Sequence, residues 1–258
     1  TADKKKKGYV EFKNVSFTYL GAEEPAVNSI SFKAGPGETT AIIGGTGSGK
    51  TTLVNLILRF YDPKEGAILV DNQDIREMAQ QDLRSRIGYV PQKAVLFTGT
   101  VRDNMAYGKD NPSEKEQKDA METAQASEFV DTLEGGYEGE ISQGGVNLSG
   151  GQKQRLSIAR ALIRKPEIYI FDDSFSALDF KTDAKLRKAL KKKTAEATLI
   201  IVAQRVSTVM NADRIIVLDK GGVVGMGKHK DLYKECPVYR EIVLSQLTEK
   251  EPLCKREK

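Results

Sequence analysis

Eight consecutive residues have the types and spacing needed to hold a phosphate group. Gly44-Gly45-Thr46-Gly47-Ser48-Gly49-Lys50-Thr51 reads G-x-x-x-x-G-K-S/T in full. Its four glycines allow positive φ and remove Cβ atoms, so successive backbone N–H groups can converge on a phosphate. We expect Lys50 to reach the β- and γ-phosphates of a nucleotide, and the Thr51 hydroxyl to hold Mg²⁺.

The residues on either side of this stretch have the pattern that such a phosphate cradle requires. Thr39–Ile43 is short, β-branched and apolar, which is typical of a buried parallel strand. Thr52–Leu58 has the composition of a buried helix. A glycine-rich turn with a chance lysine is the alternative, and the strand, loop and helix order favours the cradle because the helix N-terminus attracts anions.

Two further segments place polar side chains directly after predicted core strands. Ile168–Phe171 is apolar and ends at Asp172 and Asp173, and Ile87–Val90 is followed by Pro91 and then Gln92. Ligands of α/β sheets bind at the carboxyl ends of the strands, so we expect Asp172 to hold Mg²⁺ rather than to be a solvated turn residue. Gln92 is placed to reach a metal or an attacking water, although one glutamine establishes no role.

The whole composition limits the classes of function. The 258 residues are 39% hydrophobic and 29% charged, and 40 basic against 36 acidic residues give a net charge of +4, too mild to imply nucleic acid. No apolar run approaches the ~18 residues that span a bilayer, so we expect a soluble chain whose membrane association comes from a partner or another segment. Cys236 and Cys254 have no metal or redox spacing, which is typical of reduced thiols, and His229 is the one histidine.

The pattern along the chain predicts an α/β fold with additions. Tyr9–Phe12, Val15–Tyr19 and Asn28–Lys33 alternate like half-buried antiparallel strands. Tyr19 either stacks on a purine base or is an ordinary strand aromatic, and its position favours neither. Ser113–Ala126 is predicted to be a helix, and its Ser113 and Glu116 have the spacing of a capping box.

We expect residues 1–8 to be a linker, 9–247 a single domain with a helical subdomain inserted at about 97–165, and 248–258 a flexible tail. The segment 153–164 is predicted to be a helix, and another follows Ser176–Asp179 and runs to Lys193. The second helix carries many lysines, which either form a nucleic-acid patch or face solvent. Its apolar residues lie on one side, which favours the solvated face.

Taken together, these segments resemble the nucleotide-binding domains of ATP-binding-cassette (ABC) transporters, over roughly residues 9–247. Leu148-Ser149-Gly150-Gly151-Gln152 is the most discriminating segment of the resemblance, and residues 95–101 are similar to the exporter branch. The resemblance implies a P-loop NTPase core with a mostly parallel sheet, an N-terminal antiparallel β subdomain and an inserted α-helical subdomain. It implies ATP and Mg²⁺ as cofactors, with nucleotide contacts from Tyr19, the cradle, Thr52, Gln92, Ser149, Gly150, Gly151, Gln152 and Asp179, and metal contacts from Thr51, Gln92 and Asp172.

The resemblance also implies partners. Two such domains would pair head to tail, so that the Leu148–Gln152 segment of one completes the cradle site of the other, with Gln92 coupling the nucleotide to a transmembrane domain. The expected location is the cytoplasmic face of the cell membrane. The chain is then either a domain excised from a longer protein or a separately encoded subunit.

Two residues depart from the family pattern. The catalytic base is usually a glutamate where this chain has Asp173, and the switch residue is usually a histidine where it has Gln204. The shorter carboxylate retracts by ~1 to 1.5 Å, and a misplacement of about 1 Å can cost on the order of 10²-fold in rate. Glutamine can donate a hydrogen bond to a phosphate but cannot take a proton.

Both changes fall in this chain's own cradle half-site, while Leu148–Gln152 is intact. The hypothesis is that this chain is the degenerate-site subunit of a heterodimeric exporter, with an impaired catalytic set of Asp173, Gln204 and Gln92. Three alternatives stay open: a competent homodimeric transporter ATPase, a non-transport ABC ATPase acting on nucleic acid or ribosomes, and a nucleotide-binding module without chemistry. The chain shows no internal repeat of the kind that tandem cassettes would give.

Overall fold

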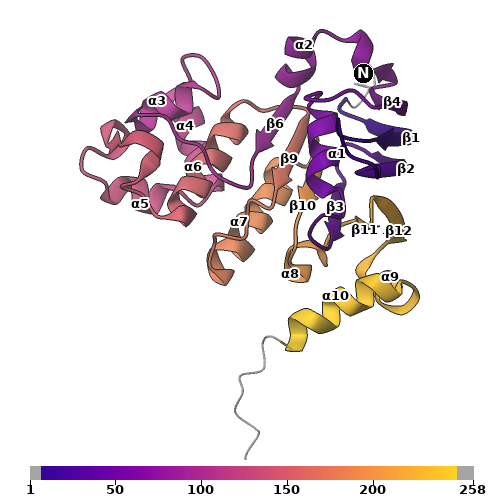
Figure 1. Ribbon diagram of the computed structural model, residues 1–258. Helices are drawn as coiled ribbons and strands as arrows, with labels where there is room; N and C mark the ends of the chain where they lie inside the picture. The colour runs from indigo at the N-terminus through magenta and orange to yellow at the C-terminus, as the bar shows by residue number, and fades with distance from the viewer. Residues whose placement is uncertain (1–6, 249–258) are drawn as a thin grey trace, which may run out of the picture.

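A computed structural model describes residues 7–248 of the chain, and two β-sheets form its centre (Figure 1). The first sheet has four antiparallel strands in the order β2-β1-β4-β5. Their bounds are Val10–Phe17 for β1, Val27–Ala34 for β2, Glu65–Val70 for β4 and Gln73–Asp74 for β5. This sheet confirms the predicted N-terminal antiparallel β subdomain.

The second sheet has six strands in the order β12-β11-β3-β10-β9-β6. All neighbours are parallel except β12, which pairs antiparallel with β11. The strands are β3 (Thr39–Gly44), β6 (Ile87–Val90), β9 (Ile168–Asp172), β10 (Thr198–Val202), β11 (Arg214–Asp219) and β12 (Gly222–Gly227). The central strands read as continuous apolar runs because both faces of this sheet are covered.

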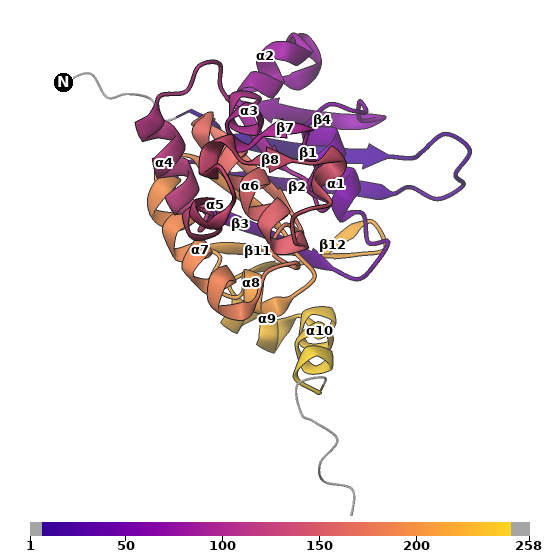
Figure 2. The same ribbon diagram turned by 90° about the vertical axis from the view of Figure 1, so that its left-hand side faces the viewer.

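Side-chain alternation divides the core into two layers. Ile42, Ile170 and Ile200 face the four-stranded sheet and α1 (Lys50–Ile57), whereas Phe171 and Ile201 pack on the opposite face. Successive residues of a strand point to opposite faces, so each central strand contributes to both layers. On the second face lie α7 (Phe180–Lys193) and helices of the lobe described next (Figure 2).

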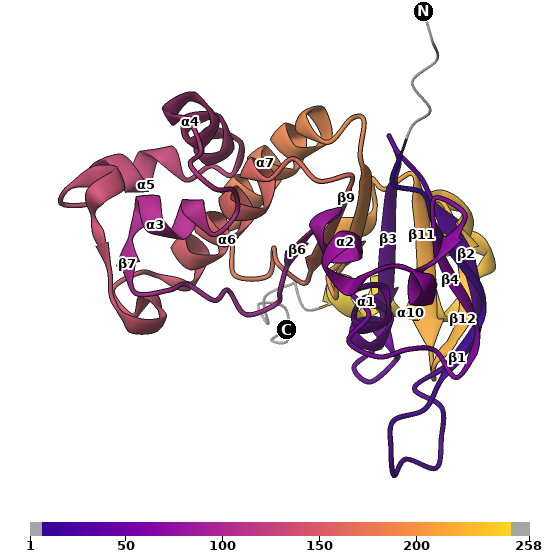
Figure 3. The same ribbon diagram turned by 90° about the horizontal axis from the view of Figure 1, so that it is seen from above.

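Four helices gather in a lobe beside the sheets, which we call the helical lobe (Figure 3). They are α3 (Val101–Ala106), α4 (Glu114–Thr123), α5 (Ser127–Thr132) and α6 (Gly150–Ile163), with the short antiparallel pair β7 (Gly99–Thr100) and β8 (Glu140–Ile141). The Ser113 and Glu116 capping box at the start of α4 is confirmed, since each residue's side chain bonds the other's backbone N–H. The predicted helical subdomain is therefore present in the fold.

The remaining elements are short or peripheral. They are α2 (Gln80–Ser85), α8 (Val206–Val209), α9 (His229–Glu235), α10 (Pro237–Thr248) and the 3₁₀ turns Ile75–Glu77, Gly136–Glu138 and Gln143–Gly145. Within residues 7–248, no helix combines the length and apolar character needed to cross a bilayer. The tail was predicted at 248–258, but Thr248 is the last residue of α10. Residues 249–258 and the first six residues of the predicted linker lie outside the described residues.

Three predicted boundaries are wrong by a few residues. The two N-terminal strands are one strand, β1, which ends at Phe17, so Tyr19 lies just beyond it. The helix expected from Ser113 to Ala126 ends at Thr123. The helix expected from Lys153 begins at Gly150, because Ser149 and Gln152 form a capping box that starts it three residues earlier.

Candidate active site

The sheet topology brings four of the predicted functional segments to one edge. Strands β3, β10, β9 and β6 are adjacent and parallel, so their carboxyl ends lie together. The cradle, residues 44–51, follows β3, Gln204 follows β10, Asp172 ends β9, and Gln92 follows β6. Residues far apart in the sequence therefore meet at the edge where α/β sheets bind ligands.

The glycines of the cradle serve different physical purposes. A Cβ on Gly44 would lie 2.3 Å from the Leu218 carbonyl oxygen, so close packing against β11 requires glycine there. Gly47 and Gly49 have φ values of +78° and +100°, in the left-handed region that favours glycine. A Cβ on Gly45 would meet nothing within 4 Å, so the bare backbone at this position faces open space.

Lys50 begins α1 with its ammonium group folded back onto the cradle. Its Nζ donates to the carbonyl oxygens of Gly44 at 2.7 Å and Gly45 at 2.6 Å. Only 8% of the residue is exposed, and burial lowers the pKa of the ammonium although Asp173 and Asp172 oppose the shift. A buried cation held mainly by neutral carbonyls is ready to accept a negative ligand.

Asp172 is the most enclosed carboxylate at this edge, with 4% of the residue exposed. Burial raises its pKa, and repulsion from Asp173 adds to the shift. The Tyr89 hydroxyl interacts with this carboxylate and opposes the shift of its pKa. Sequence reasoning missed Tyr89, whose role depends on the β6–β9 register: Tyr89 pairs with Ile170, which places it diagonally beside Asp172.

Asp173 joins three of the strand ends. Its backbone has φ +44°, and its N–H donates to the Val202 carbonyl at 2.8 Å. The carboxylate accepts a hydrogen bond from Gln92 Nε2 at 3.2 Å. Burial raises the pKa of Asp173, and the Gln204 backbone and Gln92 only oppose that shift. A strained backbone at the end of a core strand is a frequent property of functional sites.

The polar groups at this edge fit a magnesium ion that also binds phosphate. Thr51 is exposed at the start of α1, and Asp172 and Gln92 lie at the ends of β9 and β6. Among residues 7–248, no group of three or more His, Cys, Asp or Glu is placed to enclose a metal by itself. Mg²⁺ is commonly held by one or two carboxylates together with substrate phosphates, so a sparse set such as this one fits that ion.

Tyr19 belongs to an aromatic cluster beside α1. Its ring makes edge contacts with Phe17 and Tyr61, at centroid distances of 4.9 Å and 5.3 Å, and its hydroxyl lies 3.1 Å from Thr52 Oγ1. The half-buried ring is linked to the helix that follows the cradle. This contact places Tyr19 beside the cradle, and its stacking on a base remains a prediction.

The Leu148–Gln152 segment, which we call the signature segment, lies in the helical lobe. Ser149 caps α6: it accepts a hydrogen bond from the Gln152 N–H, and Gln152 Oε1 accepts one from the Ser149 N–H at 2.8 Å. A Cβ added to Gly150 or Gly151 would meet only Ala177 and Leu178, in the loop that precedes α7. Asp179 caps α7 by accepting from the Thr182 N–H. The fold thus joins the signature segment to the Asp179 loop and gives it no hydrogen bond to this chain's own cradle among the described residues.

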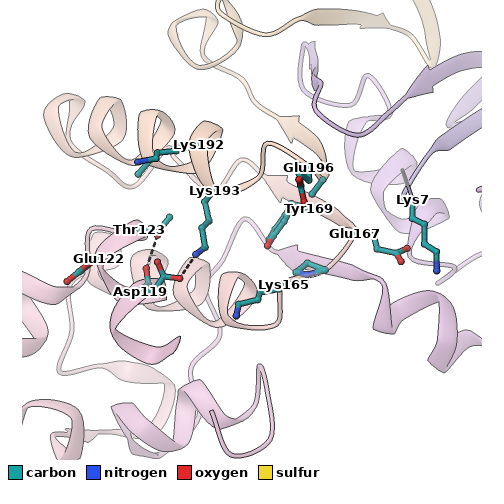
Figure 4. Close-up of a pocket in the computed structure, with 13 residues that line it drawn as sticks. Lys7, Asp119, Glu122, Thr123, Lys165, Glu167, Tyr169, Lys192, Lys193 and Glu196 are labelled. Atoms are coloured by element: carbon teal, nitrogen blue, oxygen red, sulfur yellow. Dashed lines mark hydrogen bonds and ion pairs between the residues drawn. The ribbon is translucent and has the colours of Figure 1, made fainter. Parts of the chain in front are cut away.

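A surface groove of about 720 Å³ lies between α4, α7 and the start of β9 (Figure 4). Its lining includes Lys7, Glu167, Tyr169, Lys193 and Glu196. Glu167 and Tyr169 lie at the amino-terminal end of β9, and Glu196 precedes β10, so the groove is at the edge of the sheet opposite the cradle. Volume alone therefore does not identify the site, whereas strand direction does.

The chain is similar to known proteins over most of its length. Residues 27–176, more than half of the chain, match the family described as "ABC transporter". An uncharacterized ABC transporter ATP-binding protein of Mycobacterium tuberculosis is 50% identical over 242 residues, which cover 93% of this chain and 41% of that protein. ATP-binding cassette sub-family B member 6 of Xenopus tropicalis is 43% identical, covering 90% of this chain and 27% of that protein.

A solved structure, "a bacterial Atm1-family ABC exporter with ATP bound", has a TM-score of 0.91 to this chain at 39% identity. The match covers 95% of this chain and 43% of that one. The chain spans about two fifths of the length of the bacterial relatives that it matches. It shares their fold over nearly all of its own length and belongs to the ABC transporter family.

Proposed function

We propose that this chain binds ATP with Mg²⁺ on its own cradle and provides the driving force for an ABC exporter. The observation that carries the proposal is the meeting of Lys50, Asp172 and Asp173 at the carboxyl edge of the sheet, with the pKa of each shifted by burial toward its neutral form. Such clusters of shifted groups are typical of functional sites, because a ligand supplies the missing charge. The ATP-bound exporter of similar fold supports the choice of ligand.

The residues have separable roles in this proposal. The cradle N–H groups and Lys50 would bind the phosphates, and Tyr19 would contact the base. Thr51, Asp172 and Gln92 would hold Mg²⁺, which neutralises charge on the phosphates when bound. Asp173 would accept a proton from the attacking water, and Gln204 would donate a hydrogen bond to the γ-phosphate.

The position of the signature segment supports a dimer. Ser149 and Gly151 lie at the N-terminus of α6 on the helical lobe, and within residues 7–248 they have no hydrogen bond to the chain's own cradle. A complete site therefore needs a second, similar domain packed head to tail, so that each signature segment meets the other chain's cradle. The N-terminus of α6 would then present its free N–H groups to the partner's nucleotide.

We propose further that the partner is a different chain with a more active site. Asp173 and Gln204 replace the glutamate and histidine of the family pattern, while the signature segment is intact. The Asp173 carboxylate accepts a hydrogen bond from Gln92 Nε2, which supports a restrained position for it. A short carboxylate fixed in this way is poorly placed to reach water, so this site would retain ATP while the partner's site hydrolyses it.

The rest of the assembly follows from the same proposal. The domain of residues 9–247 would attach to the transmembrane domain of an exporter through Gln92 and the helical lobe, at the cytoplasmic face of the cell membrane.

The proposal is tested by an ATP-binding titration with Mg²⁺ beside steady-state ATP hydrolysis by the purified chain. We expect tight binding and negligible turnover. Turnover that rises steeply with protein concentration would instead mean that Asp173 and Gln204 suffice in a homodimer. Absence of ATP binding would overturn the proposal as a whole.

A second experiment tests the asymmetry. The double variant Asp173→Glu and Gln204→His, assembled with a competent partner, should raise hydrolysis at this site by about tenfold or more. Each single variant serves as a control, since only the pair restores both the base and the switch residue. Unchanged hydrolysis by the double variant would contradict the assignment of this site as impaired.

A further inference from the structure

The side-chain amide of Gln246, in the last helix, forms hydrogen bonds at both ends of the segment that contains Gln204. Gln246 of α10 accepts a hydrogen bond through Oε1 from the Val206 backbone N–H at 2.8 Å. Its Nε2 donates to the Gln204 backbone carbonyl at 2.7 Å. One side chain thus bonds both ends of residues 204–206, which we call the switch segment, from a position 40 or more residues away in the sequence.

Gln246 is held on the inner face of α10. Tyr239 is 0% exposed and Val243 is 8% exposed. Val243 lies four residues after Tyr239, and Gln246 lies three residues after Val243. This spacing places all three side chains on one side of α10. Tyr239 is fixed in turn, since its hydroxyl lies 2.8 Å from Nδ1 of His229 at the start of α9. His229, the one histidine of the chain, therefore contacts α10 and not the residues of the candidate nucleotide site.

The bond from Gln246 acts on the same residue that contacts the candidate base. The Gln204 backbone opposes the rise in the pKa of Asp173, while its carbonyl accepts from Gln246. Because this carbonyl is bonded, the peptide plane that follows the Gln204 Cα is held in place. The bond therefore connects α10 to a residue whose backbone acts on Asp173.

We propose that Gln246 is a positioning residue, which fixes the switch segment so that the side chain at position 204 is aimed at the nucleotide site. Because its two bonds go to backbone groups of Gln204 and Val206, it acts in the same way whether residue 204 is glutamine or histidine. The location of the switch segment therefore depends on α10, which lies outside the cradle edge. We use this name for the carboxyl ends of β3, β10, β9 and β6. This role rests on the proposed ATP site, whereas the two hydrogen bonds of Gln246 can be tested without nucleotide.

The first test is amide hydrogen exchange of the 258-residue chain. Gln246→Met keeps the length of the side chain and removes both bonds, so exchange at Val206 should accelerate by about tenfold. Gln246→Glu retains an acceptor for the Val206 N–H and should leave exchange there within about twofold of the parent. Ser245→Ala is the matched control, since that exposed serine bonds the Ile242 carbonyl of its own helix.

The second test separates positioning from overall stability. In the Asp173→Glu, Gln204→His background with a competent partner, Gln246→Met should lower kcat about fivefold or more and leave the KM for ATP unchanged. If the exchange rate at Val206 is unaltered in Gln246→Met, or is raised equally in Ser245→Ala, the two hydrogen bonds of Gln246 do not hold the switch segment. Faster exchange with unchanged kcat would overturn the role of Gln246 in positioning, and a failure to bind ATP at all would refute the proposed function while leaving the exchange result valid.

Discussion

The α6 capping box and the Glu116 carboxylate of the helical lobe differ from the carboxylates of the cradle edge in how they are paired. In the lobe, Ser149 and Gln152 satisfy each other's backbone N–H groups. Glu116 accepts hydrogen bonds from Lys109 and Lys165, which lower the pKa of its carboxyl to about 2. These charges are matched within the chain, so they support the scaffold and require no ligand.

At the cradle edge, burial affects the pKa values of the charged groups more than their neighbours do. Burial raises the pKa values of Asp172 and Asp173 and lowers that of Lys50, in each case more strongly than the neighbouring charges oppose it. A folded protein tolerates such groups at a cost in stability, and that cost is recovered when a charged ligand binds. The Glu116 carboxyl accepts from two lysines, whereas burial outweighs the neighbouring cation at Asp172 and Asp173, so their pKa values shift in opposite directions.

The largest expected effect comes from removing the buried cation. Lys50→Met keeps the aliphatic stem but leaves no charge for the phosphates, so ATP binding should weaken by about 10²-fold or more. An equilibrium binding titration with Mg²⁺ measures the change. Lys153→Met is the matched control, because Lys153 donates to the Gly144 carbonyl in the lobe and its loss should leave binding by the isolated chain unchanged. Equal losses in both variants would contradict the distinction between the two regions.

Two neighbouring glycines test the cradle itself. Gly44→Ala places a Cβ 2.3 Å from the Leu218 carbonyl oxygen and should destabilise the fold by about 3 kcal/mol. Gly45→Ala meets nothing within 4 Å and should leave the free energy of unfolding nearly unchanged while it weakens ATP binding, because the new methyl group occupies the open side. Denaturant unfolding and binding titrations measure the two effects. Similar stabilities for both variants would show that the packing against β11 relaxes.

Local patterns in the sequence predicted this edge well. The cradle and the apolar strands before it have fixed spacing and period, so β3 and β9 are placed within one residue of their bounds in the structure. In the helical lobe, the start of α6 was predicted three residues too late, although Ser149-x-x-Gln152 has the form of a capping box that indicates the earlier start.

Other features depended on tertiary structure and were not predictable from local pattern. Tyr89 reaches Asp172 only because β6 lies beside β9 in one register. Gln246 meets the switch segment only because α10 returns beneath α8 (Figure 1). Contacts of this kind join elements whose order in space is set by the sheet, and one sequence does not determine that order by periodicity.

A smaller effect is expected at the signature segment. Ser149→Ala removes the cap of α6 and should cost about 1 kcal/mol of stability. ATP binding by the isolated chain should be unchanged, because the hydrogen bonds of Ser149 go to Gln152 and not to the cradle. Hydrolysis by the assembled dimer should fall about tenfold, since the altered segment completes the partner's site. A fall in the isolated chain's ATP affinity would contradict the proposed exchange of signature segments between chains.

The smallest effect concerns pH and compares one carboxylate from each region. The pKa of Glu116 is lowered from 4.5 to about 2, so its stabilising contribution is present above pH 4.5 and is lost as the pH falls toward 2. Asp173 has a raised pKa, so its ionised form destabilises the nucleotide-free fold, and this penalty disappears as the pH falls below its ordinary value of 3.8. The two neutral substitutions should therefore shift stability in opposite directions at pH 7.

Thermal unfolding of Glu116→Gln and Asp173→Asn, measured from pH 7 to pH 3, tests these opposite shifts in stability. Glu116→Gln should be less stable than the parent chain at pH 7, and the difference should narrow below pH 4.5. Asp173→Asn should be slightly more stable than the parent at pH 7 without nucleotide, and that advantage should vanish below pH 3.8. Saturating ATP and Mg²⁺ should reverse the order for Asp173→Asn if the carboxylate serves the bound state. A loss of stability in both variants at pH 7 without nucleotide would mean that Asp173 is part of the scaffold, as Glu116 is.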